Sequence, residues 1–355
     1  MSYLPCGVYH EYYQQDHAWW QTKFVIGKMI LLGALIFYIL PFWGGLYWVG
    51  VANLISYTIM GALGVQLLIG YCGQVTLGHA AFIAVGAYTA TLLMLQLNLP
   101  YLLSMFIGGI VAGLWAVLFG LPSAKVKGFY LIMTSLAAQF VTVDFILTQY
   151  VSQIGGRGQA FSLPPGSITI GPLVLDTDLK VYFLGAVLTI LLTMGLANLL
   201  RSKVGRAWIA IRDNDIAAET MGINIVTYKL MAFFVAGFIG GIAGSFWVST
   251  LAALSPEHFQ WFWSLWLVGV ILIGGVGSIY GTIFGSLFMV LIMEGLKFVI
   301  IPLTPVYPAL TMKFLFLKEA TFGLAICLFL IYEPNGLAYR WWQIKNYFNL
   351  WPFSY

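Results

Sequence analysis

Long apolar runs alternate with short polar stretches along almost the whole chain. A run of about 20 apolar residues is long enough to cross a bilayer as an α-helix. Measured against that length, the pattern predicts ten crossing segments, at 24–42, 46–69, 76–97, 101–121, 128–149, 181–200, 229–252, 262–276, 279–301 and 314–333. The shortest, 262–276, is marginal for a full crossing and is open to a re-entrant interpretation. The pattern predicts an all-α, polytopic integral membrane helix bundle with about 8–10 transmembrane helices.

Composition strengthens this interpretation. Of the 355 residues, 61% are hydrophobic and 8% are charged, whereas soluble domains carry about 25% charged residues. Too few polar side chains are present to cover a water-exposed surface, so we expect residues 24–340 to form one transmembrane domain. The three cysteines are scattered and odd in number, which indicates neither a disulfide framework nor a metal cluster.

Basic residues indicate which face of the bundle meets the cytoplasm, because short cytoplasmic loops are enriched in Lys and Arg. With ten crossings, one face collects Lys23, Lys125, Lys127, Arg201, Lys203, Arg206, Arg212, Arg340 and Lys345, and we predict that this face is cytoplasmic. The opposite face collects Arg157, Lys180, Lys313 and Lys318. An interpretation with eight crossings and two re-entrant segments gives the same sidedness.

This topology predicts a multi-pass protein of the cell inner membrane with both termini in the cytoplasm. Residues 1–23 are polar and aromatic, so we expect a cytoplasmic tail there rather than a cleavable signal peptide. Residues 341–355 are expected to form a second tail, and the Gly- and Pro-rich residues 150–180 the longest external loop. Nucleic-acid binding is not expected, because the basic residues form no continuous stripe.

Several glycines repeat at intervals of four residues, namely Gly237 and Gly241, Gly240 and Gly244, and Gly277, Gly281 and Gly285. Inside a membrane, helices associate through close packing of small residues rather than through hydrophobicity. We interpret these glycines as sites of close helix contact without a specific function of their own.

A second informative stretch, residues 70–88, joins two apolar segments through Gly73, Gln74, Thr76, Gly78 and His79. Irregular backbone at membrane depth survives only where protein or water satisfies its polar groups. Broken helices of this kind often line substrate paths, because free helix ends present N–H groups to an anionic carboxylate. An ordinary polar loop followed by a tightly packed helix explains the same residues equally well.

Four ionisable residues lie inside predicted crossings: Lys28, Asp144, Glu294 and Lys297. Charge buried in a membrane is costly and points to function by default. However, Glu294 and Lys297 are three residues apart and can neutralise each other, and Lys28 is close enough to the membrane boundary to reach it. The sequence therefore leaves the roles of all four residues open.

Motifs of nucleotide binding and hydrolysis are missing from the chain. It contains no phosphate-binding Gly-x-x-x-x-Gly-Lys-[Ser/Thr] loop, no His-Glu-x-x-His and no Gly-x-Ser-x-Gly. We therefore expect no catalytic residue, no bound metal and no cofactor in this chain.

The most charge-dense segment, residues 201–228, lies between two apolar segments. Ala207 to Met221 are rich in strong helix formers. Asp213, Asn214 and Asp215 are residues that can cap a helix start, and Gly222 can end one. This pattern predicts one or two short helices along the membrane surface, charged on one side and apolar on the other. The alternative is a solvated loop that merely carries positive charge.

Part of this segment resembles a known motif. Residues 217–222 read AAETMG and are similar to the EAA motif of bacterial ABC importer permeases, in which Glu-Ala-Ala is followed by three residues and Gly. The chain departs from that motif at Ile216, which replaces the Glu, and carries Asp215 one residue earlier. The resemblance implies a coupling helix that fits into a cleft of an ATPase subunit.

The whole stretch 205–224 (GRAWIAIRDNDIAAETMGIN) is similar to branched-chain amino acid permeases of the LivM type. Four further stretches resemble the same family, in the family's order: 70–79 (GYCGQVTLGH), 127–130 (KGFY), 274–281 (GGVGSIYG) and 333–337 (EPNGL). The resemblance covers residues from about 50 to 340, which is most of the chain.

The family resemblance implies which residues meet the partner proteins. It places the contact with the ATPase at Gly205, Arg206, Arg212, Asp213, Asp215, Ala217, Ala218, Glu219 and Gly222. It is also consistent with a translocation path along Gly73, Gln74, Thr76, Gly78 and His79.

The resemblance further implies a membrane subunit of a binding-protein-dependent importer. Its expected partners are two ABC ATPase subunits, a second homologous permease, a periplasmic or lipid-anchored substrate-binding protein and membrane lipid. ATP and Mg would be bound by the ATPase subunits. Urea and short-chain amide importers use similar permeases, so they remain an alternative, as do an ATP-independent carrier and a membrane-embedded enzyme.

Overall fold

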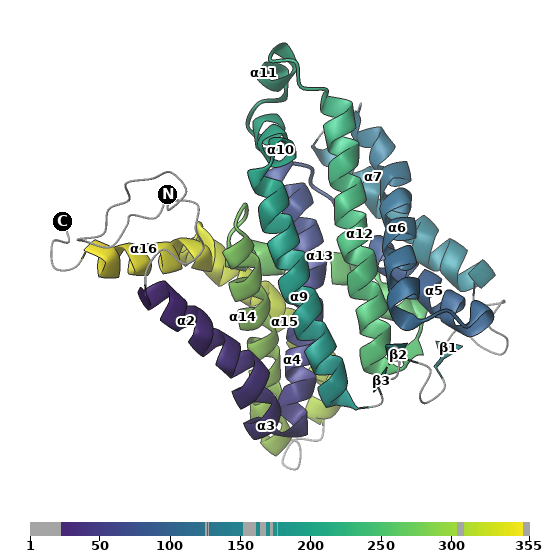
Figure 1. Cartoon of the computed structure of the whole chain (residues 1–355), viewed down its shortest axis with the longest axis vertical. Coiled ribbons are helices and arrows are strands. Elements are labelled where there is room, and N and C mark those ends of the chain that lie inside the picture. The colour runs from purple at the N-terminus through teal and green to yellow at the C-terminus, as the bar shows by residue number, and fades with distance from the viewer. Residues whose placement is uncertain are drawn as a thin grey trace.

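The computed structural model describes residues 23–124, 126, 128–151, 161–163, 168–170, 173–175, 177–303 and 309–350. Within them the chain forms a bundle of helices (Figure 1), which confirms the predicted all-α membrane architecture. Seven of the described helices are long and apolar enough to cross a membrane, namely Gly45–Tyr71, His79–Leu97, Tyr101–Gly120, Phe129–Gln149, Asp178–Arg201, Ile225–Leu251 and Ile279–Ile300.

Three of the ten predicted segments differ from these seven. Segment 24–42 forms α2 (Lys23–Ala34), the π-helix η1 (Leu35–Ile39) and α3 (Leu40–Trp43). Segment 314–333 lies in α15 (Ala309–Tyr332), whose 24 residues are enough for a crossing by length. Segment 262–276 is α13 (Trp261–Gly274), with 14 residues. The predicted number of helices therefore depends on how these three are counted.

The remaining seven predicted segments correspond to helices with similar bounds, and further short helices and α16 lie outside the predicted segments. In the first half of the chain they are α4 (Gly45–Val65), η2 (Gln66–Tyr71), α5 (His79–Leu97), α6 (Tyr101–Gly120), η3 (Leu121–Ala124), α7 (Phe129–Phe140) and η4 (Val141–Val151). In the second half they are α9 (Asp178–Arg201), α10 (Lys203–Asp213), α11 (Asp215–Thr220), α12 (Ile225–Leu251), η5 (Pro256–Phe259), α14 (Ile279–Ile300), η6 (Ile301–Leu303) and α16 (Gly336–Leu350).

The predicted loop 150–180 contains short strands in its described parts. β1 (Phe161–Ser162) pairs antiparallel with β4 (Ala253–Leu254), and β2 (Thr169–Ile170) pairs with β3 (Leu173–Val174). Figure 1 shows α10 and α11 at one end of the bundle and β2 and β3 at the other. The charged segment 201–228 and the strands β2 and β3 of the predicted external loop thus lie at opposite ends, as the predicted topology requires.

Glycines let α12 lie at the centre of the bundle, against α5 and α6. A Cβ atom on Gly86 of α5 would lie 2.2 Å from the Cα of Gly241, and one on Gly244 would lie 2.0 Å from the carbonyl oxygen of Ile83. A Cβ atom on Gly237 would lie 2.5 Å from the Cβ of Ala116 in α6. The prediction of close helix contacts is confirmed for these glycines of α12 and for Gly281 and Gly285, whose added Cβ atoms would lie 2.7 Å and 2.2 Å from carbonyl oxygens of α13. It is wrong for Gly277, which lies in the loop between α13 and α14.

The short helix α13 begins inside the bundle. Its 14 residues span about 21 Å at the usual helical rise, less than the hydrocarbon thickness of about 30 Å. Near its start, the Ser264 hydroxyl accepts a hydrogen bond from the backbone N–H of Ala80 at 2.8 Å, and the Gln139 amide donates to the carbonyl of Phe259 at 2.6 Å. The residues after α12 enter the bundle from the end that carries β4, and the residues after α13 reach the opposite end, where Gly277 touches Arg212. Segment 262–276 therefore belongs to a stretch that passes from one end of the bundle to the other, which favours a crossing over the re-entrant interpretation.

Candidate functional site

Helix α10 is anchored on the bundle through one face. The Ser202 side chain caps its start by accepting a hydrogen bond from the Val204 N–H at 3.2 Å. Trp208 is completely buried, and its indole N–H donates to the carbonyl of Tyr228 on α12 at 2.8 Å. Gly205 packs against the Leu200 backbone with no room for a side chain. The predicted division into a charged and an apolar side is confirmed for this helix.

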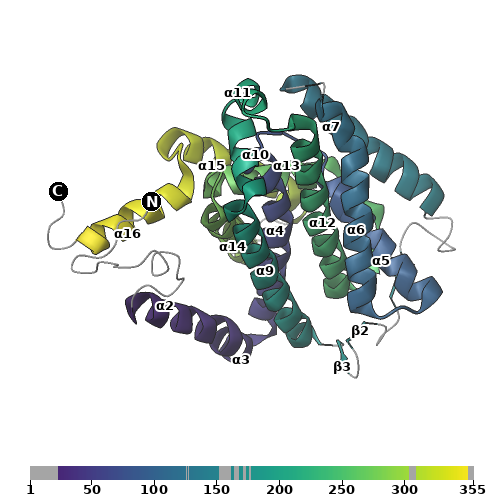
Figure 2. The ribbon, with the colours of Figure 1, turned by 45° about the horizontal axis from the view of Figure 1, so that its top comes forward.

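Helix α11 forms the outermost part of the same end (Figure 1), and both views show it beside α10 (Figures 1 and 2). Asn214 caps it by accepting from the Ala217 N–H at 3.1 Å. Gly222, with φ of +84°, follows its end, and Asn224 then caps α12. The sequence predicted one or two short helices, and the structure contains two, with the predicted cap at Asn214 and the predicted end at Gly222. The start of α10 at Lys203, before the predicted helix formers, was not predicted. Of the three candidate caps, Asn214 acts as one, whereas Asp213 binds the Arg212 guanidinium at 2.9 Å.

Arg212 joins this segment to two loops of the bundle. Its Nη1 donates to the carbonyl of Gly70 at 2.7 Å. Cβ atoms on Gly73 and Gly277 would lie 3.1 Å and 3.2 Å from its side chain, so both loops approach it closely. Gly73 and Gly277 also have positive φ angles, of 70° and 82°, which glycine adopts without steric cost. Larger residues at either position would push the loops away from Arg212.

Gln66 and Gly336 connect further segments to the loop at residues 274–278. The Gln66 amide donates to the carbonyls of Gly275 and Ser278, at 3.1 Å and 2.9 Å. Gly336, at the start of α16, packs on Gly275. We refer to residues 66–78, 274–281 and 333–336, together with Arg212, as the loop junction. It unites four of the five stretches that carried the family resemblance.

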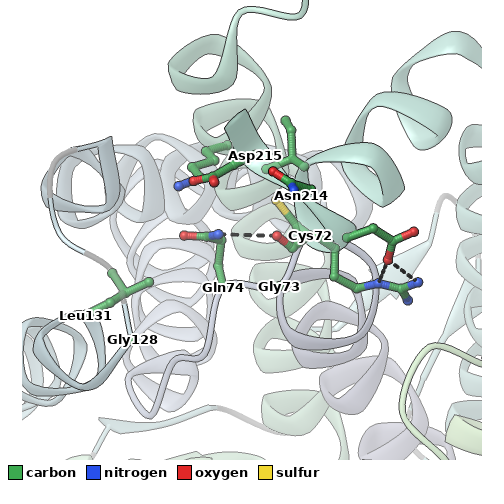
Figure 3. A pocket seen from close by; sticks show the side chains of 11 residues that line it. Cys72, Gly73, Gln74, Gly128, Leu131, Asn214 and Asp215 are labelled. Carbon is green, nitrogen blue, oxygen red and sulfur yellow. Dashed lines mark hydrogen bonds and ion pairs between the residues drawn. The ribbon is translucent and has the colours of Figure 1, made fainter. Parts of the chain in front are cut away.

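A cleft of about 330 Å³ opens beside the loop junction (Figure 3). It brings in the remaining stretch through Gly128, and its wall contains both charge signs, with Arg212 and Lys229 as cations and Asp213 and Asp215 as anions. The full lining is Cys72, Gly73, Gln74, Gly128, Leu131, Ile211, Arg212, Asp213, Asn214, Asp215 and Lys229.

The Cys72 thiol faces this cleft but is completely buried. Burial raises its pKa to about 12, and the charge of Lys229 lowers it by a smaller amount. The thiol therefore stays protonated at neutral pH, which disfavours a nucleophilic role.

The residues expected to form the translocation path are mostly enclosed. Gln74 exposes 7% of its surface, and Thr76 and His79 expose none. The His79 ring lies between Gly64 and Gly240, where added Cβ atoms would be 2.5 Å and 3.2 Å from it. Gly73 and Gln74 line the cleft, whereas Gly78 packs against the carbonyl of Ser135. The stretch is a broken helix held by tight packing, and a transport role for these residues stays a prediction.

The predicted ATPase-contact residues separate into two groups. Arg206, Arg212, Asp213, Ala217, Glu219 and Gly222 are exposed, and Asp215 is half-buried. Gly205 and Ala218 are buried, so they support the segment from within. Sequence reasoning missed Ile216 and Met221, which expose 69% and 84% of their surfaces.

The four ionisable residues predicted inside the membrane differ in their surroundings. Lys297 donates to the Glu294 carboxylate at 2.6 Å, as their spacing predicted, and the Tyr47 hydroxyl donates to the same carboxylate at 2.5 Å. Asp144 is exposed on η4. The side chain of Lys28, like Lys125, Lys127 and Arg157, lies outside the described residues.

In the described part of the chain, no three His, Cys, Asp or Glu residues are grouped to hold a metal.

Comparison with known proteins identifies related chains. Residues 47–318 match the family described as branched-chain amino acid transport system / permease component. The chain is 28% identical over 296 residues to the high-affinity branched-chain amino acid transport system permease protein LivM of Escherichia coli (strain K12), covering 77% of this chain and 68% of that protein.

Two further relatives are more distant or match over a shorter stretch. A probable branched-chain amino acid transport permease protein LivM of Methanocaldococcus jannaschii is 27% identical over 247 residues, covering 66% of this chain and 67% of that protein. The xylose transport system permease protein XylH of Haemophilus influenzae is 31% identical over 141 residues, or 38% of each chain. No solved structure matches this chain.

Proposed function

We propose a transport function for this chain, which belongs to the family of branched-chain amino acid ABC transport permeases of the LivM type. In this proposal it is one of two membrane subunits of an importer in the cytoplasmic membrane. Two ATPase subunits bind ATP and Mg on the cytoplasmic side, and a soluble binding protein delivers an aliphatic amino acid from outside. The match over residues 47–318 is the observation that carries the proposal.

The structure suggests how movement would pass from the ATPase into the membrane. The exposed surface of α11 would dock into the ATPase, while α10 is fixed to α12 through Trp208. Arg212 adds a second connection, because it binds Gly70 in η2, the π-helix that continues α4. The same side chain touches Gly277 between α13 and α14. A displacement of α10 would therefore reach the ends of α4 and α13 as well as α9 and α12.

Uptake by reconstituted vesicles tests this function. The chain, its companion permease and the ATPase subunits are placed in proteoliposomes with ATP inside, and the binding protein and radiolabelled leucine are added outside. We expect leucine accumulation that requires ATP and all the subunits. Accumulation by this chain alone without ATP would establish a secondary carrier instead, and ATP-driven uptake of urea or acetamide but not leucine would establish an amide importer.

Gly222→Arg is a direct test of the coupling surface. Gly222 has free space around it, but its φ of +84° is unfavourable for Arg, and the new side chain would stand on the proposed docking face. We expect membrane insertion to persist, while ATPase binding and leucine uptake are lost. Gly222→Asn is the control, since Asn tolerates this backbone conformation at small cost. Normal uptake by Gly222→Arg would show that this surface does not contact the ATPase.

A further inference from the structure

A second cavity lies between α4, α13, α14 and α15, and it does not share a lining residue with the cleft at the loop junction. Its volume is about 310 Å³, at the lower limit of about 300–1,000 Å³ that small-molecule pockets usually have. The size suits a small metabolite rather than a lipid or a peptide. We refer to it as the aromatic cavity.

One wall of the aromatic cavity is a rigid stack of rings. Trp266 of α13 stacks on Phe322 of α15 with ring centres 5.0 Å apart, and Trp263 stacks on Trp266 at 6.2 Å. Tyr57 of α4 continues the stack beyond Trp263 at 5.3 Å. Leu54 contributes an aliphatic side chain to the lining. Such a wall offers a flat apolar surface for an aliphatic side chain.

The lining also contains two cations and two anions from facing helices. Glu294 and Lys297 come from α14, and Lys318 and Glu319 come from α15. Glu294 is 4% exposed and binds Lys297 at 2.6 Å, so this pair is already neutral without help from α15. Lys318 and Glu319 add one further charge of each sign to the lining, and charge inside a membrane protein carries a desolvation cost. A ligand with one charge of each sign matches such a lining better than a cation, an anion or a neutral amide.

The Trp266 indole N–H and the backbone N–H groups at the start of α13 are hydrogen-bond donors at the aromatic cavity, and both favour a ligand carboxylate. The Trp266 side chain is 6% exposed, and its indole N–H has no hydrogen-bond partner among the described residues. A buried donor without a partner is costly, and a ligand oxygen would satisfy it. In addition, α13 begins at the cavity with Gln260 and Phe262 in the lining. The free N–H groups at a helix start favour a carboxylate.

We propose that the aromatic cavity binds the transported amino acid as a zwitterion, with its aliphatic side chain against the ring stack. The carboxylate would lie near Lys318, the Trp266 N–H and the start of α13, and the ammonium group near Glu319. This inference rests on the proposed transport function and adds to it a binding step inside this chain.

Equilibrium binding of radiolabelled L-leucine to the purified complex, without the binding protein, tests the inference. We expect saturable binding, with 4-methylvalerate and isoamylamine, which each lack one of the two charged groups, competing at least about tenfold more weakly than unlabelled leucine. Lys318→Met and Trp266→Phe should each weaken leucine binding several-fold. Lys313→Met, on the same helix but outside the cavity lining, is the matched control and should bind like the wild type.

The variants also separate this inference from the transport function. Trp266→Phe keeps the stacked ring and removes only the N–H donor, so a folded complex is expected. If the Lys318→Met and Trp266→Phe complexes bind and take up leucine normally, the aromatic cavity is not the binding site, although the transport function stands. If the wild-type complex binds leucine in the expected way but shows no ATP-driven uptake, the transport function fails while the site remains.

Discussion

Helices α10 and α11 are neighbours in sequence but differ in how much of their surface is buried. α10 buries Trp208 completely and bonds to α12 and to Gly70. Among the residues of α11, Ala218 is buried, whereas Ile216 exposes 69% of its surface. One helix is thus held by the bundle, and the other is free to meet a partner. Changes in α10 should damage the bundle or its response, and changes in α11 should damage docking alone.

The largest effect is expected for Trp208→Ala in α10. Truncation of a large buried aromatic side chain costs about 3–5 kcal/mol in free energy of unfolding, and here it also leaves the Tyr228 carbonyl without its indole donor. We expect the melting temperature of the detergent-purified chain to fall clearly, as measured by a thermal shift assay. Trp208→Phe should lose less stability because it retains most of the volume. An unchanged melting temperature for Trp208→Ala would contradict an anchoring role of α10.

Arg212→Gln should change the coupling rather than the fold. The substitution removes the bond to Gly70 at 2.7 Å, on a side chain that is 36% exposed and therefore partly solvated. We expect leucine uptake per ATP hydrolysed to fall about tenfold, within the usual range of coupling between distant sites, while ATPase subunits still bind. Lys203→Gln is the matched control, because Lys203 is exposed on the same helix and is not among the predicted ATPase-contact residues. Equal loss in both variants would mean that charge, not the link to Gly70, matters.

Local features of this region were predictable from sequence, whereas its connections were not. Asn214 and Gly222 act on residues within a few positions of themselves, so their residue types reveal a helix start and a helix end. In contrast, Arg212 and Gly70 are 142 positions apart, and no local pattern pairs them.

The burial or exposure of individual side chains in the candidate sites could not be predicted from the neighbouring sequence either. His79 was interpreted as either a path residue or part of a packed helix, and the glycines that enclose it come from α4 and α12. The exposure of Ile216 was missed because an apolar residue in such a hydrophobic chain gives no signal of its own. Only the fold shows which apolar side chains the bundle leaves uncovered.

A double variant, Ile216→Ser with Met221→Ser, tests the proposed docking role of α11. Both side chains are exposed at the outer end of the segment, at 69% and 84%, so their removal should leave the melting temperature unchanged. If they enter a cleft of the ATPase, its binding should weaken about fivefold, or about 1 kcal/mol, as measured by titration of the ATPase subunits. Unchanged affinity together with unchanged uptake would mean that α11 is solvated and has no docking role, as in the solvated alternative that the sequence left open.

The smallest effect is expected for Asn214→Ala, at the boundary between the two helices. Loss of a helix cap costs about 0.5–2 kcal/mol, and α11 has only six residues to share it. We expect faster hydrogen exchange in residues 215–220, with α10 unchanged, because Trp208 and Arg212 hold α10 independently of the cap. Asn214→Asp should restore protection, since a carboxylate accepts the Ala217 N–H equally well. If exchange in α10 rose together with that in α11, the two helices would be one cooperative unit, and the division between an anchored half and a docking half would be wrong.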